Sequence, residues 1–340
     1  MADPLQVGLV GFGLAGRVFH GSLLAADPQF DLAVIVTGNP ERQQAARHLH
    51  LGADVVSTAD EMLSRDLDLV VIASPPATHV PLAMAALDAG LAVVVDKPMC
   101  ASAAEGEQLV AHAAAVGRLL TVFQNRRWDS DFLTLKRVIQ SGALGGVRSV
   151  ESRFERWKPE PDPAKPWRTA SPDAAGGVVY DLGSHLIDQA VQLLGPVTDV
   201  HAELASRSGR PAPDDGFLSL QHADGAVSRL WMSSVAAQPG PRFRVLGSDG
   251  AFVSWSLDPQ EAQLTAGMTP DDPAYGLPRR EDWPVVGVSG ATDVVSPERG
   301  DYPAFYRGVA QALRNETATP VDPNDSVEVI RILEAAHRIG

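Results

Sequence analysis

Two carboxylates and an imidazole lie close together in the sequence of this 340-residue chain. Asp181 and His185 are four residues apart and Asp188 follows three residues later, so on a helix all three lie near one face. A carboxylate beside an imidazole can take up and pass on the proton of a hydroxyl group. The simpler interpretation is an acidic residue near a helix N-cap, followed by a hydrogen-bonded histidine at the edge of a core. The chemical interpretation therefore needs a cofactor that takes part in the same reaction.

The start of the chain indicates such a cofactor, because an apolar run leads directly into G-x-G-x-x-G. In this motif Gly11 permits a tight turn, Gly13 lets a pyrophosphate approach the backbone, and Gly16 allows close packing of helix on strand. The helix that follows favours anions at its unpaired N–H groups. The motif alone is weak evidence, but its position after a strand favours a dinucleotide site over a plain strand-turn-helix corner. The expected cofactor-binding residues are Gly11, Phe12, Gly13, Leu14, Ala15 and Gly16.

The residues after the second expected strand bear on the choice of cofactor. An acidic residue there would bind the adenosine ribose of NAD, but the sequence has none at that place. It offers Thr37, Asn39 and Arg42, and a guanidinium pairs well with the 2′-phosphate of NADP. We therefore expect NADP rather than NAD, although NAD is possible and Arg42 could also be an ordinary solvated residue of a helix.

A lysine follows the fifth expected strand, at the edge of the sheet where ligands of such folds bind. Lys97 comes after the apolar residues 93–95 and Asp96, and a proline follows it. Most lysines are simply solvated, but this setting favours one that faces a ligand. The fourth expected strand ends at the same edge and is followed by Ser74, Pro75 and His79.

The elements that position these residues alternate between strand and helix in the first third of the chain. The strands are rich in Val, Leu and Ile without polar alternation, as a parallel sheet covered on both faces requires. This pattern predicts a doubly wound fold. The expected strands are residues 6–10, 32–36, 54–56, 69–73, 92–95 and 119–123, and the expected helices are residues 14–26, 41–49, 59–64, 80–89 and 103–116.

The composition limits the class of partner. The chain has 28 Lys+Arg against 42 Asp+Glu and a net charge of −14, so we expect neither a nucleic acid nor an anionic membrane as a partner. No apolar run is long enough to cross a bilayer, and the N-terminus lacks the features of a signal peptide. Cys100 is the only cysteine, which agrees with a reducing compartment. These observations predict a cytoplasmic protein.

Taken together, three motifs resemble the glucose-fructose oxidoreductase, inositol dehydrogenase and rhizopine-catabolism (Gfo/Idh/MocA) family. They are the N-terminal G-F-G-x-x-G, D-K-P at residues 96–98 (the family's usual form is E-K-P), and G-x-x-x-D-x-G-x-H-x-x-D at residues 177–188. The resemblance covers essentially the whole chain. Within the family, residues 12–20, 125–129 and 180–185 look most like those of NADP-dependent scyllo-inositol dehydrogenases.

The resemblance implies two domains. Residues 1–123 would form a Rossmann domain, and residues 124–340 an α/β domain on an open, mostly antiparallel sheet that binds substrate and forms a homodimer or homotetramer. Strand-like segments at residues 147–154, 197–204, 217–222, 226–232, 242–246 and 251–256 fit the second domain. Two further segments, residues 157–173 and 269–299, read as irregular. The second of these could be an interface arm, a lid or a surface loop.

The resemblance also implies an NAD(P)-dependent dehydrogenase that interconverts a secondary alcohol and a ketone on a cyclitol or sugar. His185 would take the hydroxyl proton, Asp181 would bind substrate and tune His185, and Lys97 would stabilise charge on the substrate oxygen. Pro75 and His79 would border the cofactor, and no metal would be needed. Two alternatives remain: a regulator that only senses NADP(H), and a redox-assisted glycosidase of the same family. The expected substrate-binding residues are Asn125, Arg127, Trp128, Trp167, Arg168, Tyr180, Asp181 and His185.

Overall fold

The computed structural model of the protein describes residues 3–160, 169–315 and 317–340. The chain divides into two compact units, each built from segments that are separated in the sequence. The first unit contains Met1–Asn125, Gln260–Tyr275 and Asp301–Val327. The second contains Arg126–Pro259, Gly276–Gly300 and Glu328–Gly340.

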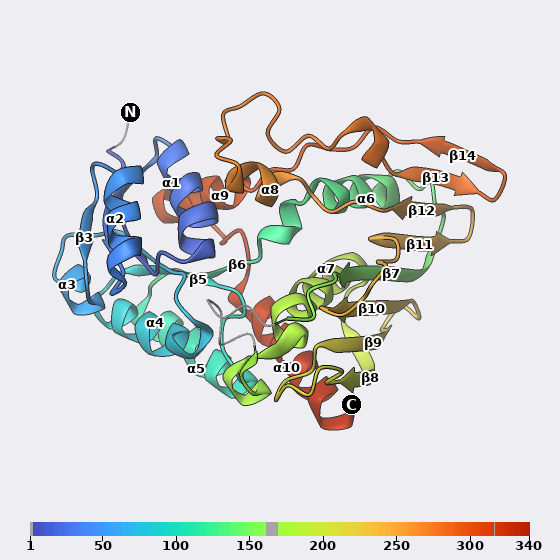
Figure 1. Cartoon of the computed structure of the whole chain (residues 1–340), viewed down its shortest axis with the longest axis horizontal. Coiled ribbons are helices and arrows are strands. Elements are labelled where there is room, and N and C mark those ends of the chain that lie inside the picture. The colour runs from blue at the N-terminus through green and yellow to red at the C-terminus, as the bar shows by residue number, and fades with distance from the viewer. Residues whose placement is uncertain (1–2, 161–168, 316) are drawn as a thin grey trace. The chain divides into compact units, whose positions relative to one another are not determined.

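The first unit is built on a parallel six-stranded sheet with the strand order β3-β2-β1-β4-β5-β6, as a doubly wound fold requires. Figure 1 labels β3 and β6, the two edge strands of this sheet. Strands β4 and β5 are deeply buried: the four residues of β4 and the three valines of β5 are almost inaccessible to solvent. The predicted fold class is confirmed. The strands are β1 (Leu5–Val10), β2 (Phe30–Val36), β3 (Asp54–Val56), β4 (Leu69–Ile72), β5 (Ala92–Asp96) and β6 (Leu120–Phe123).

The helices of this unit follow the strands as predicted, with one difference in the first. The expected helix over residues 14–26 is a π-helix, η1 (Ala15–Gly21), that continues into the short α1 (Ser22–Ala26). A Cβ atom at Gly21 would lie 2.9 Å from the Gly16 carbonyl oxygen, so glycine permits this wide turn. The other helices are α2 (Pro40–Leu49), α3 (Ala59–Leu63), α4 (His79–Asp88), α5 (Ala103–Val116), α8 (Gln260–Thr265) and α9 (Pro303–Asn315).

Two late segments pack in the first unit, although the sequence suggested a single boundary after residue 123. Aromatic side chains of α9 and the residue before it explain the packing of the second segment, Asp301–Val327: Phe305 lies 4.9 Å from Phe123 between ring centroids, and Tyr302 lies 5.9 Å from Phe19. The hydroxyl of Thr121 on β6 also donates to the carbonyl oxygen of Val321 over 2.7 Å. The first unit is therefore completed by residues far from the N-terminus.

The second unit is built on an eight-stranded sheet with the order β14-β13-β12-β11-β7-β10-β9-β8. Among the described strand pairs of this sheet, β7 and β10 alone are parallel and the others are antiparallel. Helix α6 (Ser130–Gln140) packs Phe132 and Leu135 against Phe243 and Val245 of the sheet, forming the core of the unit. The strands are β7 (Val147–Glu155), β8 (Val197–Ala205), β9 (Asp215–His222), β10 (Val227–Ser233), β11 (Phe243–Gly247), β12 (Ala251–Ser254), β13 (Val285–Val288) and β14 (Ala291–Val294), and the remaining helices are α7 (Ser184–Leu194) and the C-terminal part of α10 (Pro323–Ile339).

Strands β13 and β14 lie within residues 269–299, which the sequence analysis treated as irregular. They form a hairpin that extends the edge of the sheet, with Val288 paired to Ala291 across the turn of Ser289 and Gly290. All four residues of β14 are exposed. The segment is therefore partly an added edge of the sheet.

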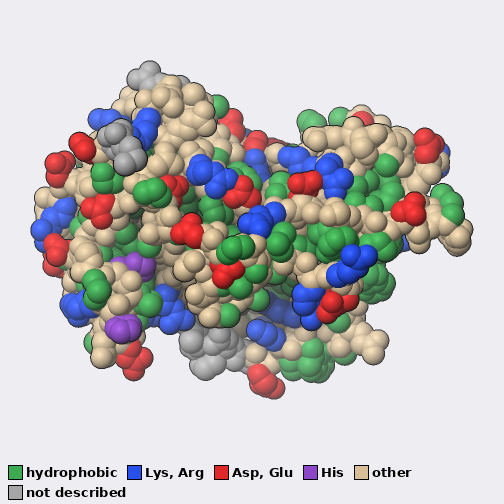
Figure 2. Space-filling model, turned by 90° about the horizontal axis from the view of Figure 1, so that it is seen from above, with side chains coloured by type: hydrophobic (Ala, Val, Ile, Leu, Met, Phe, Trp, Pro, Cys, Tyr) green, Lys and Arg blue, Asp and Glu red, His purple; other side chains and the backbone are tan. Residues whose placement is uncertain are grey.

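The surface carries no dominant patch of one charge on the face that Figure 2 shows, where acidic and basic side chains are interspersed. Within the part of the chain that the structure describes, no helix is long and apolar enough to cross a membrane.

Candidate active site

The glycine loop after β1 has the shape that a dinucleotide needs. Gly11 has φ +96°, and a Cβ there would lie 2.6 Å from the carbonyl oxygen of Ala73. A Cβ at Gly13, by contrast, would meet no heavy atom closer than Nη1 of Arg42, at 4.0 Å. The loop thus packs tightly against β4 at Gly11 and leaves open space at Gly13, where a pyrophosphate would need to approach the backbone.

The end of β2 brings its expected residues together, but two of them also have structural partners. Asn39 caps α2, since its side-chain oxygen accepts a hydrogen bond from the backbone N–H of Arg42 over 2.9 Å. Thr37 is buried, and its carbonyl oxygen accepts from the side chain of Gln43 over 2.9 Å. The cap directs the backbone so that the exposed Arg42 guanidinium lies beside Gly13 of the glycine loop. Gln43 is a positioning residue that the sequence analysis did not identify.

The loop after β4 is held by its own hydrogen bonds. The hydroxyl oxygens of Ser74 and Thr78 lie 2.6 Å apart, and Thr78 donates to the carbonyl oxygen of Pro75 over 2.7 Å. His79 is fully buried, with Nε2 at 2.8 Å from the carbonyl oxygen of Ser74 and Nδ1 at 2.9 Å from that of Pro98. Burial lowers the pKa of His79, although these backbone contacts oppose the shift. His79 therefore ties together the loops that follow β4 and β5.

Lys97 follows the last residue of β5 and is partly exposed. Its backbone N–H donates to Oδ1 of Asp96 over 2.8 Å, and the Lys97–Pro98 peptide bond is cis. The carbonyl of Pro98 is the one that His79 contacts. The backbone on both sides of Lys97 is thus fixed by side chains of the same unit.

In the second unit, Asp181 lies in a short π-helix, η6 (Val179–Gly183), that leads into α7. Its carboxylate pairs with the Arg156 guanidinium, with Nη2 and Oδ2 3.5 Å apart. Arg156 was not identified from the sequence, because it follows a strand 25 residues earlier and no local pattern links the two. A Cβ at Gly183 would lie 3.1 Å from Sδ of Met232, so this glycine allows η6 to pack closely on β10.

His185 lies in the first turn of α7 and is 5 % exposed. Its ring and that of Phe154 of β7 are T-shaped, with 6.1 Å between the centroids and an interplanar angle of 70°. The imidazole is therefore fixed on a helix, next to an apolar ring, one turn after the carboxylate of Asp181. This placement suits a general base whose orientation is set by packing.

The second acidic residue of the motif, Asp188, has a different setting from Asp181. Asp188 is 2 % exposed and accepts two hydrogen bonds from Arg127, over 2.9 Å from Nε and 2.6 Å from Nη2. A guanidinium that makes a two-pronged pair with a buried carboxylate is a rigid cross-link. Arg127, expected to contact substrate, thus connects the start of this unit to α7.

The remaining expected substrate residues differ in setting. Tyr180 is buried and stacks on His337 at 5.4 Å between ring centroids. Asn125 is buried and Trp128 is half-buried, both in the 3-10 turn η3 (Asn125–Trp128). Trp167 and Arg168 lie outside the described residues.

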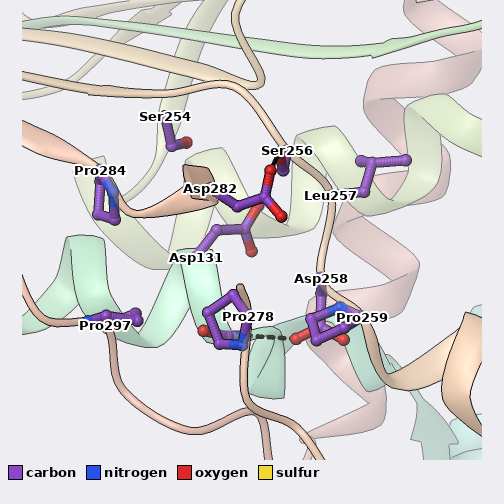
Figure 3. A pocket seen from close by; sticks show the side chains of 11 residues that line it. Asp131, Ser254, Ser256, Leu257, Asp258, Pro259, Pro278, Asp282, Pro284 and Pro297 are labelled. Carbon is purple, nitrogen blue, oxygen red and sulfur yellow. Dashed lines mark hydrogen bonds between the residues drawn. The ribbon is translucent and has the colours of Figure 1, made fainter. Parts of the chain in front are cut away.

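A small acidic pocket of the second unit was not foreseen from the sequence. Asp131, Asp258 and Asp282 line a cavity of about 20 Å³, and the hydroxyl of Ser254 points toward it (Figure 3). Asp131 pairs with Nε of Arg242 at 3.2 Å, while Asp258 accepts from the backbone N–H of Ser130 over 2.6 Å. The space suits a single water molecule. Among the described residues, no group of three or more His, Cys, Asp or Glu side chains is placed to hold a metal ion.

Burial changes the pKa values of two carboxylates in and beside this pocket. It raises the pKa of Asp129 well above its usual range, and repulsion from Asp258 and Asp131 adds to the effect while Arg126 opposes it. Burial likewise raises the pKa of Asp131, against the attraction of Arg242. Asp129 and Asp131 with their arginine partners thus form a buried charged network, and the stability of the fold depends on its protonation.

Comparison with known proteins agrees with the geometry of both units. Residues 5–124 match the model of an oxidoreductase family with an NAD-binding Rossmann fold, and residues 132–253 match the GFO/IDH/MocA C-terminal domain. The chain belongs to the Gfo/Idh/MocA family of NAD(P)-dependent oxidoreductases.

The relatives include one with a named reaction. The chain is 35 % identical to the scyllo-inositol 2-dehydrogenase (NADP(+)) IolW of Bacillus subtilis, over 98 % of this chain and 93 % of that protein. It is 36 % identical to the uncharacterized oxidoreductase YdgJ of Escherichia coli, over 98 % and 96 %. The solved structure of YvaA from Bacillus subtilis matches with a TM-score of 0.92 at 34 % identity, covering 100 % of this chain and 96 % of that one.

Proposed function

We propose that this protein uses NADP to interconvert a secondary alcohol and a ketone on a cyclitol or sugar. The observation that carries the proposal is a nearly buried imidazole, His185, that follows the carboxylate of Asp181 by four residues on the same helical segment. An oxidoreductase that removes hydrogen from a CH–OH group needs a residue to take the hydroxyl proton, and this pair supplies one.

Each residue would have a separate role. His185 takes the proton from the substrate hydroxyl in the oxidative direction and returns it in the reductive one. Asp181, held by Arg156, would bind the substrate and tune His185. Lys97, on a backbone fixed by Asp96 and His79, stabilises negative charge as it develops on the substrate oxygen. When bound, the nicotinamide cofactor supplies or accepts the hydride.

The glycine loop and Arg42 would hold the cofactor. The open space at Gly13 fits a pyrophosphate, and the nearby Arg42 guanidinium fits a 2′-phosphate. We expect NADPH to bind several-fold more tightly than NADH, and Arg42→Ala to narrow this difference. A fluorescence titration with both nucleotides measures it. Equal affinities that Arg42→Ala leaves unchanged would contradict the choice of NADP.

The substrate class follows from the polar groups available and from the reaction named for IolW. Each hydroxyl left unpaired in a closed site costs about 1–3 kcal/mol, so a polyol needs many donors and acceptors. Lys97, Asn125, Asp181 and His185 would supply them. Arg127 is already bonded to Asp188 and offers no clamp for a phosphate group. A neutral cyclitol or sugar is therefore favoured over a sugar phosphate.

A substrate panel tests the reaction and its alternatives together. NADP⁺ reduction is followed with scyllo-inositol, myo-inositol, glucose, xylose and glucose 6-phosphate, and the reverse reaction with inosose. We expect turnover of an inositol or aldose and little of the phosphate. A preference for the phosphorylated sugar contradicts the proposed substrate class. Absence of turnover on every polyol favours a sensor of NADP(H), and bound cofactor that never exchanges favours a redox-assisted glycosidase.

We also propose that the eight-stranded sheet forms a homodimer or homotetramer through its more exposed face. On that face Arg153 stacks on Trp231 at 3.8 Å, and Phe217 lies 5.0 Å from Trp231 between ring centroids. Such aromatic and guanidinium surfaces are typical of protein interfaces. Light scattering on the wild type and on Trp231→Glu tests the proposal: we expect the variant to dissociate, and a monomeric wild type would refute it.

A further inference from the structure

One buried polar group of the first unit has no part in the roles assigned above. His20 lies on η1 and is fully buried, with Nδ1 2.6 Å from the hydroxyl oxygen of Tyr306 on α9. Its Nε2 atom is also buried and has no hydrogen-bond partner among the described residues. A buried polar atom without a partner costs free energy. The position of this imidazole therefore needs an explanation beyond packing.

The two side chains lie beside the strand end that carries Asp96. The His20 ring is 4.4 Å from Phe123 and the Tyr306 ring is 6.1 Å from it, both between centroids. Phe123 is the direct partner of Asp96 in the pairing of β5 with β6. Burial, and then the negative charge of Asp96, raise the pKa of the Tyr306 phenol. The phenol thus keeps its hydrogen and lies within the electrostatic reach of that carboxylate.

Asp96 connects this group to Lys97. Its Oδ1 atom accepts the backbone N–H of Lys97 over 2.8 Å. The orientation of the carboxylate therefore affects the orientation of the Lys97 backbone and the direction in which its side chain leaves the strand.

The tautomer of His20 determines whether the Tyr306 hydroxyl donates or accepts the hydrogen bond between them. Burial, together with the nearby His79, lowers the pKa of His20 to about 3, so the ring is neutral at neutral pH. A proton on Nε2 would leave a buried N–H donor unpaired, whereas a proton on Nδ1 leaves only an acceptor unpaired, and orphaned N–H groups are the rarer case. With the proton on Nδ1, His20 donates to the Tyr306 oxygen. The hydroxyl hydrogen can then turn toward the negative charge of Asp96.

We propose that His20 and Tyr306 are positioning residues for Lys97. The Nδ1–H of His20 orients the Tyr306 hydroxyl toward the Asp96 carboxylate, and Asp96 in turn fixes the backbone of Lys97. The kinetic part of this proposal rests on the proposed function of Lys97. The tautomer of His20 can be measured on the full chain without any substrate.

The first experiment is nitrogen NMR of the protein labelled with ¹⁵N-histidine. The signals of the His20 ring are assigned by their absence from the spectrum of His20→Asn. We expect them to show a protonated Nδ1 and an unprotonated Nε2 at neutral pH. Tyr306→Phe should shift the Nδ1 signal because the hydrogen bond is lost. A protonated Nε2 in the wild type overturns the proposal whatever the turnover is.

The second experiment uses two variants that replace different ring atoms. The amide of His20→Asn can donate near the position of Nδ1, whereas that of His20→Gln lies near Nε2. We expect His20→Asn to keep kcat within about threefold, and His20→Gln and Tyr306→Phe to lower kcat about tenfold, since small misplacements of a reacting group are costly. The Kd for NADPH should not change in any of them.

Tyr302→Phe is the matched control, because it removes another buried tyrosine hydroxyl from the same aromatic cluster. We expect it to leave kcat unchanged. Equal loss of kcat in His20→Asn and His20→Gln, or an unchanged kcat in Tyr306→Phe, would overturn the positioning role. If the wild type turned over no polyol, the proposed function would fail and the NMR result alone would decide the arrangement of His20 and Tyr306.

Discussion

Acidification should destabilise this protein through His20, and the size of the effect can be worked out from its burial. The unfolded chain binds a proton at His20 with a pKa near 6.5, whereas the folded protein resists it until the pH approaches about 3. A folded pKa below the unfolded one gives stability that is fully present above pH 6.5 and is lost as the pH falls toward 3. Between pH 7.5 and pH 5, this one residue accounts for a loss of about 2 kcal/mol.

The measurement is urea unfolding of the wild type and of His20→Asn at several pH values over this range. Other groups titrate too, including the buried His79, so only the difference between the two curves reports His20. When the pH is lowered from 7.5 to 5, we expect the free energy of unfolding of His20→Asn to fall about 2 kcal/mol less than that of the wild type. His48→Asn, which changes an exposed histidine of the same unit, is the control. Parallel curves for wild type and His20→Asn would refute the reasoning, since they require a His20 that takes up its proton in the folded state.

Three further predictions concern the candidate site and the second unit. Lys97→Met and His185→Ala should each lower kcat about 100-fold or more without weakening NADPH binding in a fluorescence titration; near-normal turnover in either variant would exclude its role. Asp188→Asn leaves the Arg127 guanidinium buried without a charged partner, and urea unfolding should show a loss of about 3 kcal/mol, whereas a loss under about 1 kcal/mol would mean that the pair is well solvated. Because burial raises the pKa of Asp129, its folded form keeps a proton that the unfolded form releases, so stability falls as the pH rises from about 4 through the folded pKa. Asp129→Asn should remove that part of the pH dependence, and an unchanged slope between pH 5 and pH 8 would contradict it.

The sequence was sufficient for the strands of the first unit because each is a short apolar run between turn residues. Strand β3 occupies the predicted residues, and the other five agree with prediction to within two residues at either end. The same rule failed for β13 and β14, where the runs are short and one contains Gly287 in an unusual conformation, with φ +139°. The Ser289-Gly290 pair between two valine-containing runs is a hairpin signal that could have identified them.

Local patterns could not predict the pairs that hold the candidate site in place. Arg127 and Asp188 are 61 residues apart, and Thr121 and Val321 are 200 apart. These residues meet because the folded topology brings distant segments together. The periodicity of either segment alone does not indicate which residue of the other it will contact. Sequence patterns therefore identified candidate residues such as Asp181, but not the residue that orients it, Arg156.

The two π-helices show why the sequence pattern and the folded structure are both needed to describe the candidate site. η1 follows the glycine loop directly, and η6 contains Asp181 and ends just before α7. A π-helix is rare and persists where packing compensates for its geometry, often at functional sites. Here the compensation depends on close approach at glycines: Gly21 to the Gly16 carbonyl in η1, and Gly183 to Met232 in η6. A helical period of 3.6 residues predicts an ordinary helix at both places, yet it is the wider turn that carries His20 in the first unit and Asp181 in the second. The glycines in these segments therefore affect the candidate site indirectly, because they permit the wide turns that position His20 and Asp181.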